Sequence, residues 1–238
     1  MEIQIAVAKT NKYASIESGD TLEVVERPNG GLSVVLSDGQ TSGRGAKSIS
    51  GMVVRRAISL MAEGVRDGTA ARAASDYLYT ERNGKVSATL NIFSIDFLTK
   101  TLVITRNNPI PVYLSLDDKL ISLSTESQVL GTNRNIRPSI SEIPFQSGLF
   151  AIMFTDGLFY AGDRTGRRID ISASLQELLE DENPDAQSVA DSLLNKALRL
   201  DEGRASDDIS VVVLRVHEKT TDSIRRMLVT LPVPDRYG

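Results

Sequence analysis

The stretch LSVVLSDGQTSGRGAKSIS, residues 32–50, predicts a buried strand that runs through a polar loop into a helix. The apolar run ends in Asp38-Gly39, and helical spacing of apolar residues begins at Ala46. A carboxylate at the end of a buried strand, next to a glycine that exposes its backbone carbonyl, could supply two ligands to a hard metal ion. Asp-Gly is also a common turn dipeptide, so an ordinary strand–turn–helix connection is the alternative.

The composition narrows the chemistry that this chain can perform. Of the 238 residues, 41% are hydrophobic and 24% charged, and the net charge is −4 with a pI near 5.2, which disfavours nucleic acid and anionic membranes as partners. Cysteine is absent and His217 is the single histidine, which excludes a thiolate nucleophile and zinc sites built from Cys and His. A catalytic metal would need carboxylate, carbonyl and water ligands, which favours Mg²⁺ or Mn²⁺.

No targeting or membrane segment is predicted. The N-terminal sequence MEIQIAVAKT lacks a basic segment followed by a long apolar one, and no apolar run approaches the roughly 20 residues of a membrane helix. Together with the absence of cysteine, this predicts a cytoplasmic protein.

Apolar periodicity predicts one α+β domain over residues 1–238, with two sheets and helices outside them. We expect strands at 3–8, 22–27, 32–37, 101–105, 111–115, 119–123, 149–157 and 206–216, and a long strand with a bulge at 86–97. Helices are expected as a hairpin over 46–82, around 175–179 with a stop at Asn183-Pro184, and over 186–197. Residues 124–148 are expected to form a connecting loop with a hairpin tip at Asp117-Asp118 before it, and the C-terminal extension 217–238 a short helical stretch at 224–229.

Four aspartates share one setting. An antiparallel hairpin would place Asp20 and Asp38 side by side, and Asp156 and Asp207 also adjoin apolar runs at predicted strand ends. If such carboxylates converge within about 4 Å, each pair repels by about 4 kcal/mol at an effective dielectric of about 20. The cluster would then require divalent cations or bound protons. Four unrelated turn or cap aspartates are the alternative reading of the same spacing.

A family resemblance favours the first reading. It rests on SGDT (18–21), SDGQTSGRGAKSIS (37–50), ATLNIFSID (88–96), RNNPIPVYL (106–114), FTDGLFYA (154–161) and SDDISVVVL (206–214). In this order they resemble the metal-dependent protein phosphatases of the 2C type, in particular the bacterial subgroup typified by stage II sporulation protein E, over residues 15–216. The resemblance implies a four-layer αββα sandwich of two packed antiparallel β-sheets flanked by helices. It also implies hydrolysis of phosphoserine or phosphothreonine in a protein, by water activated at a centre of two Mn²⁺ or Mg²⁺ ions.

The resemblance also implies a role for each aspartate. Asp38 and Asp156 are expected to be catalytic, with Asp38 bridging both metal ions. The Gly39 carbonyl and Asp20 are expected to serve one ion, and Asp156 and Asp207 to hold the other.

The sequence departs from the family at three positions. Asp208 stands where many relatives have Asn, and is expected to support the ligands rather than bind metal. Thr41 replaces a glycine that is usual in the subgroup, and Gln40 stands where many eukaryotic relatives have a candidate general acid, a histidine. These departures leave open a second reading, a catalytically silent phosphatase-like module that acts by binding a partner protein.

The partners that the resemblance implies are proteins. They are a phosphorylated substrate, for instance an anti-sigma-factor antagonist, and a second copy of the chain that contacts the helical hairpin 46–82. Neither nucleic acid nor a membrane is expected as a partner.

Overall fold

The computed structural model describes residues 1–117, 119–180, 184–218 and 222–232, which form two five-stranded antiparallel sheets. The first sheet has the order β1 (Glu2–Thr10), β10 (Ile209–His217), β9 (Phe150–Phe154), β6 (Val112–Leu116) and β7 (Lys119–Leu123). The second has the order β2 (Asp20–Glu26), β3 (Leu32–Asp38), β4 (Leu90–Asp96), β5 (Thr101–Asn107) and β8 (Ser139–Pro144). The predicted α+β class with two antiparallel sheets is therefore confirmed.

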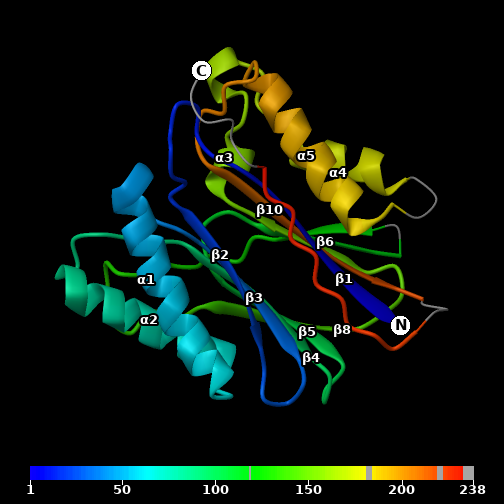
Figure 1. Ribbon diagram of the computed structural model, residues 1–238, viewed down its shortest axis with the longest axis horizontal. Helices are drawn as coiled ribbons and strands as arrows, with labels where there is room; N and C mark the ends of the chain where they lie inside the picture. Colours follow the sequence, from blue (N-terminus) through cyan, green and yellow to red (C-terminus); the bar gives the residue numbers. More distant parts are fainter. Residues whose placement is uncertain (118, 181–183, 219–221, 233–238) are drawn as a thin grey trace.

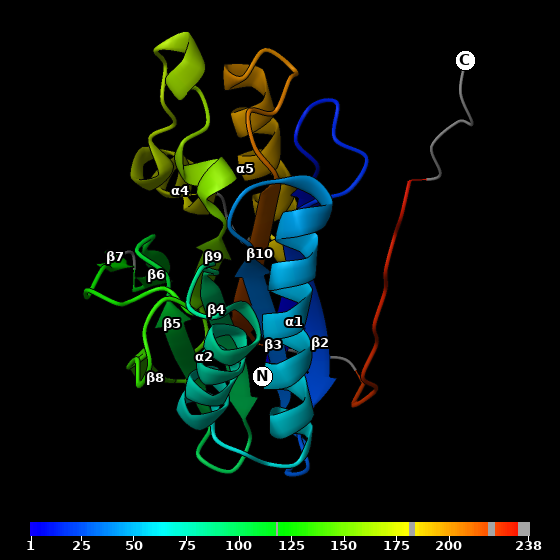
Figure 2. The same cartoon turned by 90° about the vertical axis from the view of Figure 1, so that its left-hand side faces the viewer.

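The helices cover the outer face of each sheet (Figure 1). The hairpin of α1 (Gly43–Ala62) and α2 (Asp67–Arg82) packs on the second sheet, and α4 (Ile171–Leu179) and α5 (Ala186–Leu200) pack on the first. Figure 2 shows the same layering from the side of α1 and α2. The described chain contains no helix with both the length and the apolar character of a membrane span.

Three apolar clusters fill the spaces between the four layers. One lies between the first sheet and α4 and α5, one between the second sheet and α1 and α2, and one between the two sheets. Strand β3 contributes to two of them, since Val35 faces the helices whereas Val34 and Leu36 face the other sheet. Burial on both faces explains why this strand has a continuous apolar run rather than an alternating one.

The predicted bulge in residues 86–97 is wrong. Strand β4 pairs without interruption with both neighbours, from Leu90 to Asp96 on the β5 side. Leu90 and Ile92 face the helices, and Phe93 and Ile95 face the other sheet. The change of phase that suggested a bulge instead marks a regular strand whose apolar face changes along its length.

Other boundaries differ from expectation in smaller ways. The predicted loop 124–148 contains β8, an edge strand whose residues alternate between half-buried and exposed. Strand β9 ends at Phe154, and Asp156 begins the short helix α3 (Asp156–Phe159), which is followed by the 3-10 turn η1 (Asp163–Thr165). Residues 222–232 form neither a helix nor a strand, so the predicted helical stretch at 224–229 is wrong. Asp118 and Asn183, which were expected at a hairpin tip and a helix stop, lie outside the described residues.

Candidate active site

Two of the predicted site aspartates come from the second sheet. The β2–β3 hairpin pairs Asp20 with Asp38 in register, as the sequence predicts. Register partners in an antiparallel pair have their side chains on the same face, and here that face also carries Leu22 and Leu36 and is turned toward the other sheet.

The other two aspartates come from the first sheet. Asp156 lies two residues after the end of β9, and Asp207 lies two residues before the start of β10, its neighbour in the sheet. Asp38, Asp156 and Asp207 line one cavity of about 390 Å³. The remaining lining residues are Gly39, Gln40, Thr41, Ser87, Ala88 and Thr89. The structure therefore brings carboxylates from both sheets to one end of the sandwich.

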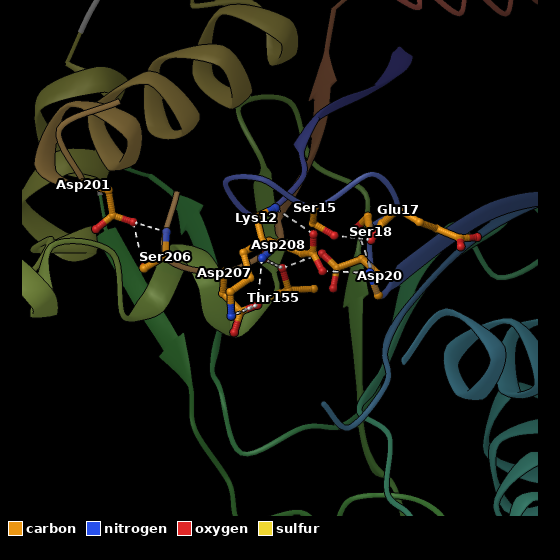
Figure 3. Close-up of polar contacts among 11 residues, drawn as sticks. Lys12, Ser15, Glu17, Ser18, Asp20, Thr155, Asp201, Ser206, Asp207 and Asp208 are labelled. Carbon is orange, nitrogen blue, oxygen red and sulfur yellow. Dashed lines mark hydrogen bonds and ion pairs between the residues drawn. The ribbon is translucent and has the colours of Figure 1, made fainter. Parts of the chain in front are cut away.

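Asp20 is held by donors from the first sheet. Its Oδ2 accepts hydrogen bonds from the hydroxyls of Thr155, at 2.9 Å (Figure 3), and Ser210, at 2.6 Å. Its backbone carbonyl accepts from the ammonium groups of Lys9 in β1 and Lys47 in α1. The residue is only 1% exposed, and its other carboxylate oxygen, Oδ1, is buried without a hydrogen-bond partner in the described chain. A buried carboxylate oxygen without a donor is costly, and a cation would compensate for it.

The four aspartates also interact through their charges. Burial raises the pKa of Asp20 to about 6, although the Ser210 hydroxyl favours the charged form. Burial, followed by the charges of Asp20, Asp156 and Asp207, raises the pKa of Asp38 to about 9. Burial, followed by the charge of Asp207, also raises the pKa of Asp156. Without cations Asp38 therefore retains a proton at neutral pH.

The two Asp-Gly dipeptides at the site, Asp38-Gly39 and Asp156-Gly157, need their glycine for close backbone contact. A Cβ at Gly39 would lie 2.1 Å from the carbonyl oxygen of Ala46 in α1, and a Cβ at Gly157 would lie 2.1 Å from that of Asp208. In each case the missing side chain lets another segment pack directly behind a site aspartate. Close backbone packing therefore requires glycine after Asp38 and after Asp156, although the packed segment is α1 in one case and the residue just before β10 in the other.

Asp208 points away from the cavity and organises a loop. Its Oδ1 accepts from the Lys12 N–H at 2.8 Å and its Oδ2 from the Gly19 N–H at 2.7 Å (Figure 3). Asp208 is 4% exposed and does not line the cavity. The carboxylate thus fastens both ends of the loop that leads into Asp20, whereas an Asn could accept only one of these bonds through its single carbonyl oxygen.

Gln40 and Thr41, the two loop positions where the resemblance implies a different residue, line the cavity. The Gln40 side-chain carbonyl accepts from the Ser87 N–H at 2.9 Å, so its amide nitrogen is the end without a partner in the described chain. Thr41 has a φ of +82°, in the left-handed region that β-branched residues rarely adopt. The glycine expected at this position would suit that backbone without strain.

The donor set suits a hard divalent cation in its chemistry. It combines several carboxylates, the partnerless Oδ1 of Asp20 and pKa values raised by burial and, at Asp38, by the charges of neighbouring carboxylates, a repulsion that bound cations would offset. Within the described ranges, no three His, Cys, Asp or Glu side chains already have the spacing of a metal site. Cation binding would therefore have to draw the carboxylates together.

Three residues of this region were missed by sequence reasoning. Thr155 and Ser210 are the donors to Asp20, and the fully buried Asp201 accepts from the N–H groups of Gly162 and Ser206. Asp201 therefore fixes the loop that precedes Asp207. The available signal was a hydroxyl residue inside or beside a strongly apolar strand, as in FTDG and ISVVV. His217 lies at the far end of β10, as the register partner of Glu2.

The sheet order, the helix layers and the aspartates at one end of the sandwich define a protein-phosphatase-2C-like α+β fold. The sequence model of the family described as "Stage II sporulation protein E (SpoIIE)" matches residues 28–217, and the chain belongs to this family.

Individual relatives are distant. Stage II sporulation protein E of Priestia megaterium is 21% identical over 218 residues, which cover 92% of this chain and 37% of that protein. The phosphatase domain of SpoIIE from Bacillus subtilis, solved with a fragment of its regulatory domain, superimposes with a TM-score of 0.79 at 19% identity, over 92% of this chain and 64% of that one. The catalytic domain of the phosphatase PstP in complex with two manganese ions gives 0.68 at 16% identity, over 91% and 99%. The chain thus spans 37% and 26% of the lengths of the two curated relatives, from Priestia megaterium and Bacillus subtilis, that it matches.

Proposed function

We propose that this chain is a Mn²⁺- or Mg²⁺-dependent protein phosphatase that hydrolyses phosphoserine or phosphothreonine. The observation that carries the proposal is the carboxylate of Asp38, which lines the cavity and interacts electrostatically with Asp20, Asp156 and Asp207. Four acidic groups drawn from two sheets to one buried end of a domain are costly unless they serve cations. Membership of the SpoIIE family and the manganese-bound relative support the same reading.

Under this proposal Asp38 would contact both ions, Asp20 and the Gly39 carbonyl would hold one, and Asp156 and Asp207 the other. When bound, the two cations would supply the Lewis acidity that activates water and offsets phosphate charge. The protein's own part is to hold the carboxylates in place. Thr155 does so across the two sheets, through its hydrogen bond to Asp20.

The neutral wall of the cavity would receive the phosphate. Gln40, Thr41, Ser87 and Thr89 bring amide and hydroxyl groups to the cavity that the acids also line, and such groups can donate to phosphoryl oxygens without adding negative charge. None of these side chains is an acid of suitable pKa, so we propose that water, rather than a side chain, protonates the leaving group.

Hydrolysis of p-nitrophenyl phosphate tests the proposal. The wild type should be active with Mn²⁺ or Mg²⁺ and inactive with a chelator, and Asp38→Asn should lower kcat/KM by about 100-fold or more, because it removes a shared ligand. Asp191→Asn, an exposed aspartate of α5, is the matched control and should retain full activity. Equal background rates in all samples would refute the enzyme and favour the silent binding module.

The physiological substrate and the assembly are further parts of the proposal. We propose a phosphoserine on a small bacterial regulator, such as an anti-sigma-factor antagonist, as the substrate, and a homodimer contact through α1 and α2. A dimer that governs the metal site should make activity per chain depend on protein concentration. Constant specific activity over a wide dilution series would contradict that coupling.

A further inference from the structure

A second hollow lies between α2 and the start of β8. Its volume is about 510 Å³, and it shares no lining residue with the cavity at Asp38. It is lined by Arg72 and Asp76 of α2 and by Asn135, Arg137, Pro138 and Ile140. Figure 2 faces this side of the molecule, with α2 and β8 next to each other. We call this hollow the α2–β8 groove.

The charge of the groove contrasts with that of the chain. Arg72 and Arg137 are both exposed, and neither has a carboxylate within ion-pair distance in the described chain. Among the described residues, Arg72 donates a side-chain hydrogen bond only to the Thr69 hydroxyl, at 3.2 Å. Asp76 is the one acid of the lining, so the groove has a local excess of positive charge in a protein whose net charge is −4.

The groove is held open by direct packing of α2 on the sheet. A Cβ at Gly68, in the first turn of α2, would lie 2.7 Å from Cδ1 of Ile140. The helix and the strand therefore meet in close contact beside the groove. Asp76 also accepts the Asn135 N–H at 3.4 Å, which links the helix to the loop on the other wall. Arg72 on α2 and Arg137 on the segment before β8 therefore extend from two segments that contact each other.

The same groove opens onto a free sheet edge. Strand β8 is the last strand of the second sheet in the described chain and pairs with β5 alone. The backbone groups on its outer side are a template for an added strand. Ile140, which is 49% exposed, and Pro138 place apolar surface at the point where the edge meets the groove.

We propose that the α2–β8 groove binds an extended, acidic segment of a partner protein. The segment would add to β8 as a further strand through backbone hydrogen bonds and place carboxylates against the guanidinium groups of Arg72 and Arg137. Guanidinium groups match carboxylates in planar geometry, and the edge favours an extended chain over a helix. Glu142, further along β8, is exposed and would repel a carboxylate placed beside it. The acidic residues of the bound segment are therefore expected near Ile140, at the start of the strand.

Two synthetic peptides provide the probe. Glu-Val-Glu-Val-Thr-Val-Thr-Val carries its acids at one end, and the control peptide has Lys in place of each Glu. With the full chain, fluorescence anisotropy should detect binding of the acidic peptide and not of the basic one, and added salt should weaken it. The double variant Arg72→Gln/Arg137→Gln should bind it at least about fivefold more weakly. Arg134→Gln removes a guanidinium that stacks on Tyr79 outside the groove and should leave binding unchanged.

Hydrogen exchange tests the strand itself. The acidic peptide should slow exchange of those amides in residues 139–143 that do not bond to β5, because an added strand would engage the free edge. Equal binding of the two peptides, failure of the acidic peptide to bind, unchanged binding by the double variant, or binding without protection of β8 would each overturn the proposal. Because the readouts are binding and exchange, they are independent of phosphatase activity.

Discussion

Asp20 and Asp38 face each other as register partners on β2 and β3, at the end of the sheet where the cavity lies. Like charges directly opposed across two strands destabilise a sheet. The pair is tolerated because burial and mutual repulsion raise the pKa of Asp38 to about 9, so that it retains its proton when no cation is bound. The stability of the metal-free protein should therefore depend on pH.

We expect the metal-free protein to lose stability as pH rises from about 5 to about 9. The ordinary pKa of Asp is 3.8, whereas those of Asp20 and Asp38 in the folded state are about 6 and about 9. Between these limits the folded state binds more protons than the unfolded state, so unfolding becomes easier as pH rises. Thermal unfolding in the presence of a chelator measures this trend, and Asp38→Asn should remove most of it. A melting temperature that rises over this range would contradict the assignment.

Manganese should stabilise the protein most at high pH. Cations compete with protons for the same carboxylates, so their effect is largest where the carboxylates have lost protons. Thermal scans at pH 8 with Mn²⁺ and with chelator should differ by several degrees in the wild type and little in Asp38→Asn. Calcium at equal concentration is a useful comparison, since it tests coordination rather than charge alone. Identical scans with and without Mn²⁺ would argue against a metal centre.

Gly39→Ala should destabilise the protein by about 2 kcal/mol or more and impair the site. The new methyl group would collide with the Ala46 carbonyl and push α1 away from the Asp38 loop. Gly45→Ala is the matched control, because its Cβ would meet nothing closer than the Thr41 hydroxyl, at 3.7 Å. That variant should be neutral or stabilising by about 0.5 kcal/mol. Urea unfolding of both variants measures the difference, and equal midpoints would show that the close contact is unimportant.

Thr41→Gly should stabilise the protein by up to about 1 kcal/mol. Glycine relieves the strain of a β-branched residue at a φ of +82°, although it also gains entropy in the unfolded state. Thr41→Ala, which keeps a Cβ, should not show this gain, and is the control. The comparison is again made by urea unfolding. A destabilised Thr41→Gly would mean that the threonine side chain contributes more than its backbone strain costs.

Asp208→Ala should cost about 2–3 kcal/mol, since it leaves the N–H groups of Lys12 and Gly19 without their charged acceptor. Asp208→Asn should cost about half as much because its carbonyl can still accept one bond. Asp191→Ala, on the exposed face of α5, should change stability by no more than about 0.5 kcal/mol. Amide exchange in residues 12–19 should rise in Asp208→Ala and not in the control. Unchanged exchange there would refute the role of Asp208 as a loop clamp.

The segment around Asp38 could be predicted from the sequence because the patterns that define its strand, turn and helix are local. The run that ends at Asp38, the turn before it and the helix after it were all expected, and the register of Asp20 with Asp38 followed from the hairpin. The convergence of Asp156 and Asp207 on the same cavity could not follow from spacing, because it depends on how two sheets face each other. The family resemblance supplied that step.

The failures have physical causes of a different kind. The sequence does not predict strand β8, because an edge strand is short and half-exposed and its residues therefore lack a strong apolar period. The supposed bulge in β4 came from a strand covered on one face by helices and on the other by a sheet, which changes its apolar face without changing its pairing. The donors Thr155 and Ser210 become recognisable only when the partner of each hydroxyl is known.

The apolar layer between the two sheets also acts as a spacer. Within the pair Asp20 and Asp38, the distance is fixed by the hydrogen-bond ladder of one sheet, whereas the distance from that pair to Asp156 and Asp207 depends on side chains such as Leu36 and Met153. Changing the bulk of these side chains would alter the thickness of the sandwich and so widen or narrow the gap between the two halves of the cluster. Ordinary core substitutions, far from any reacting atom, could thereby retune which ion fits the site.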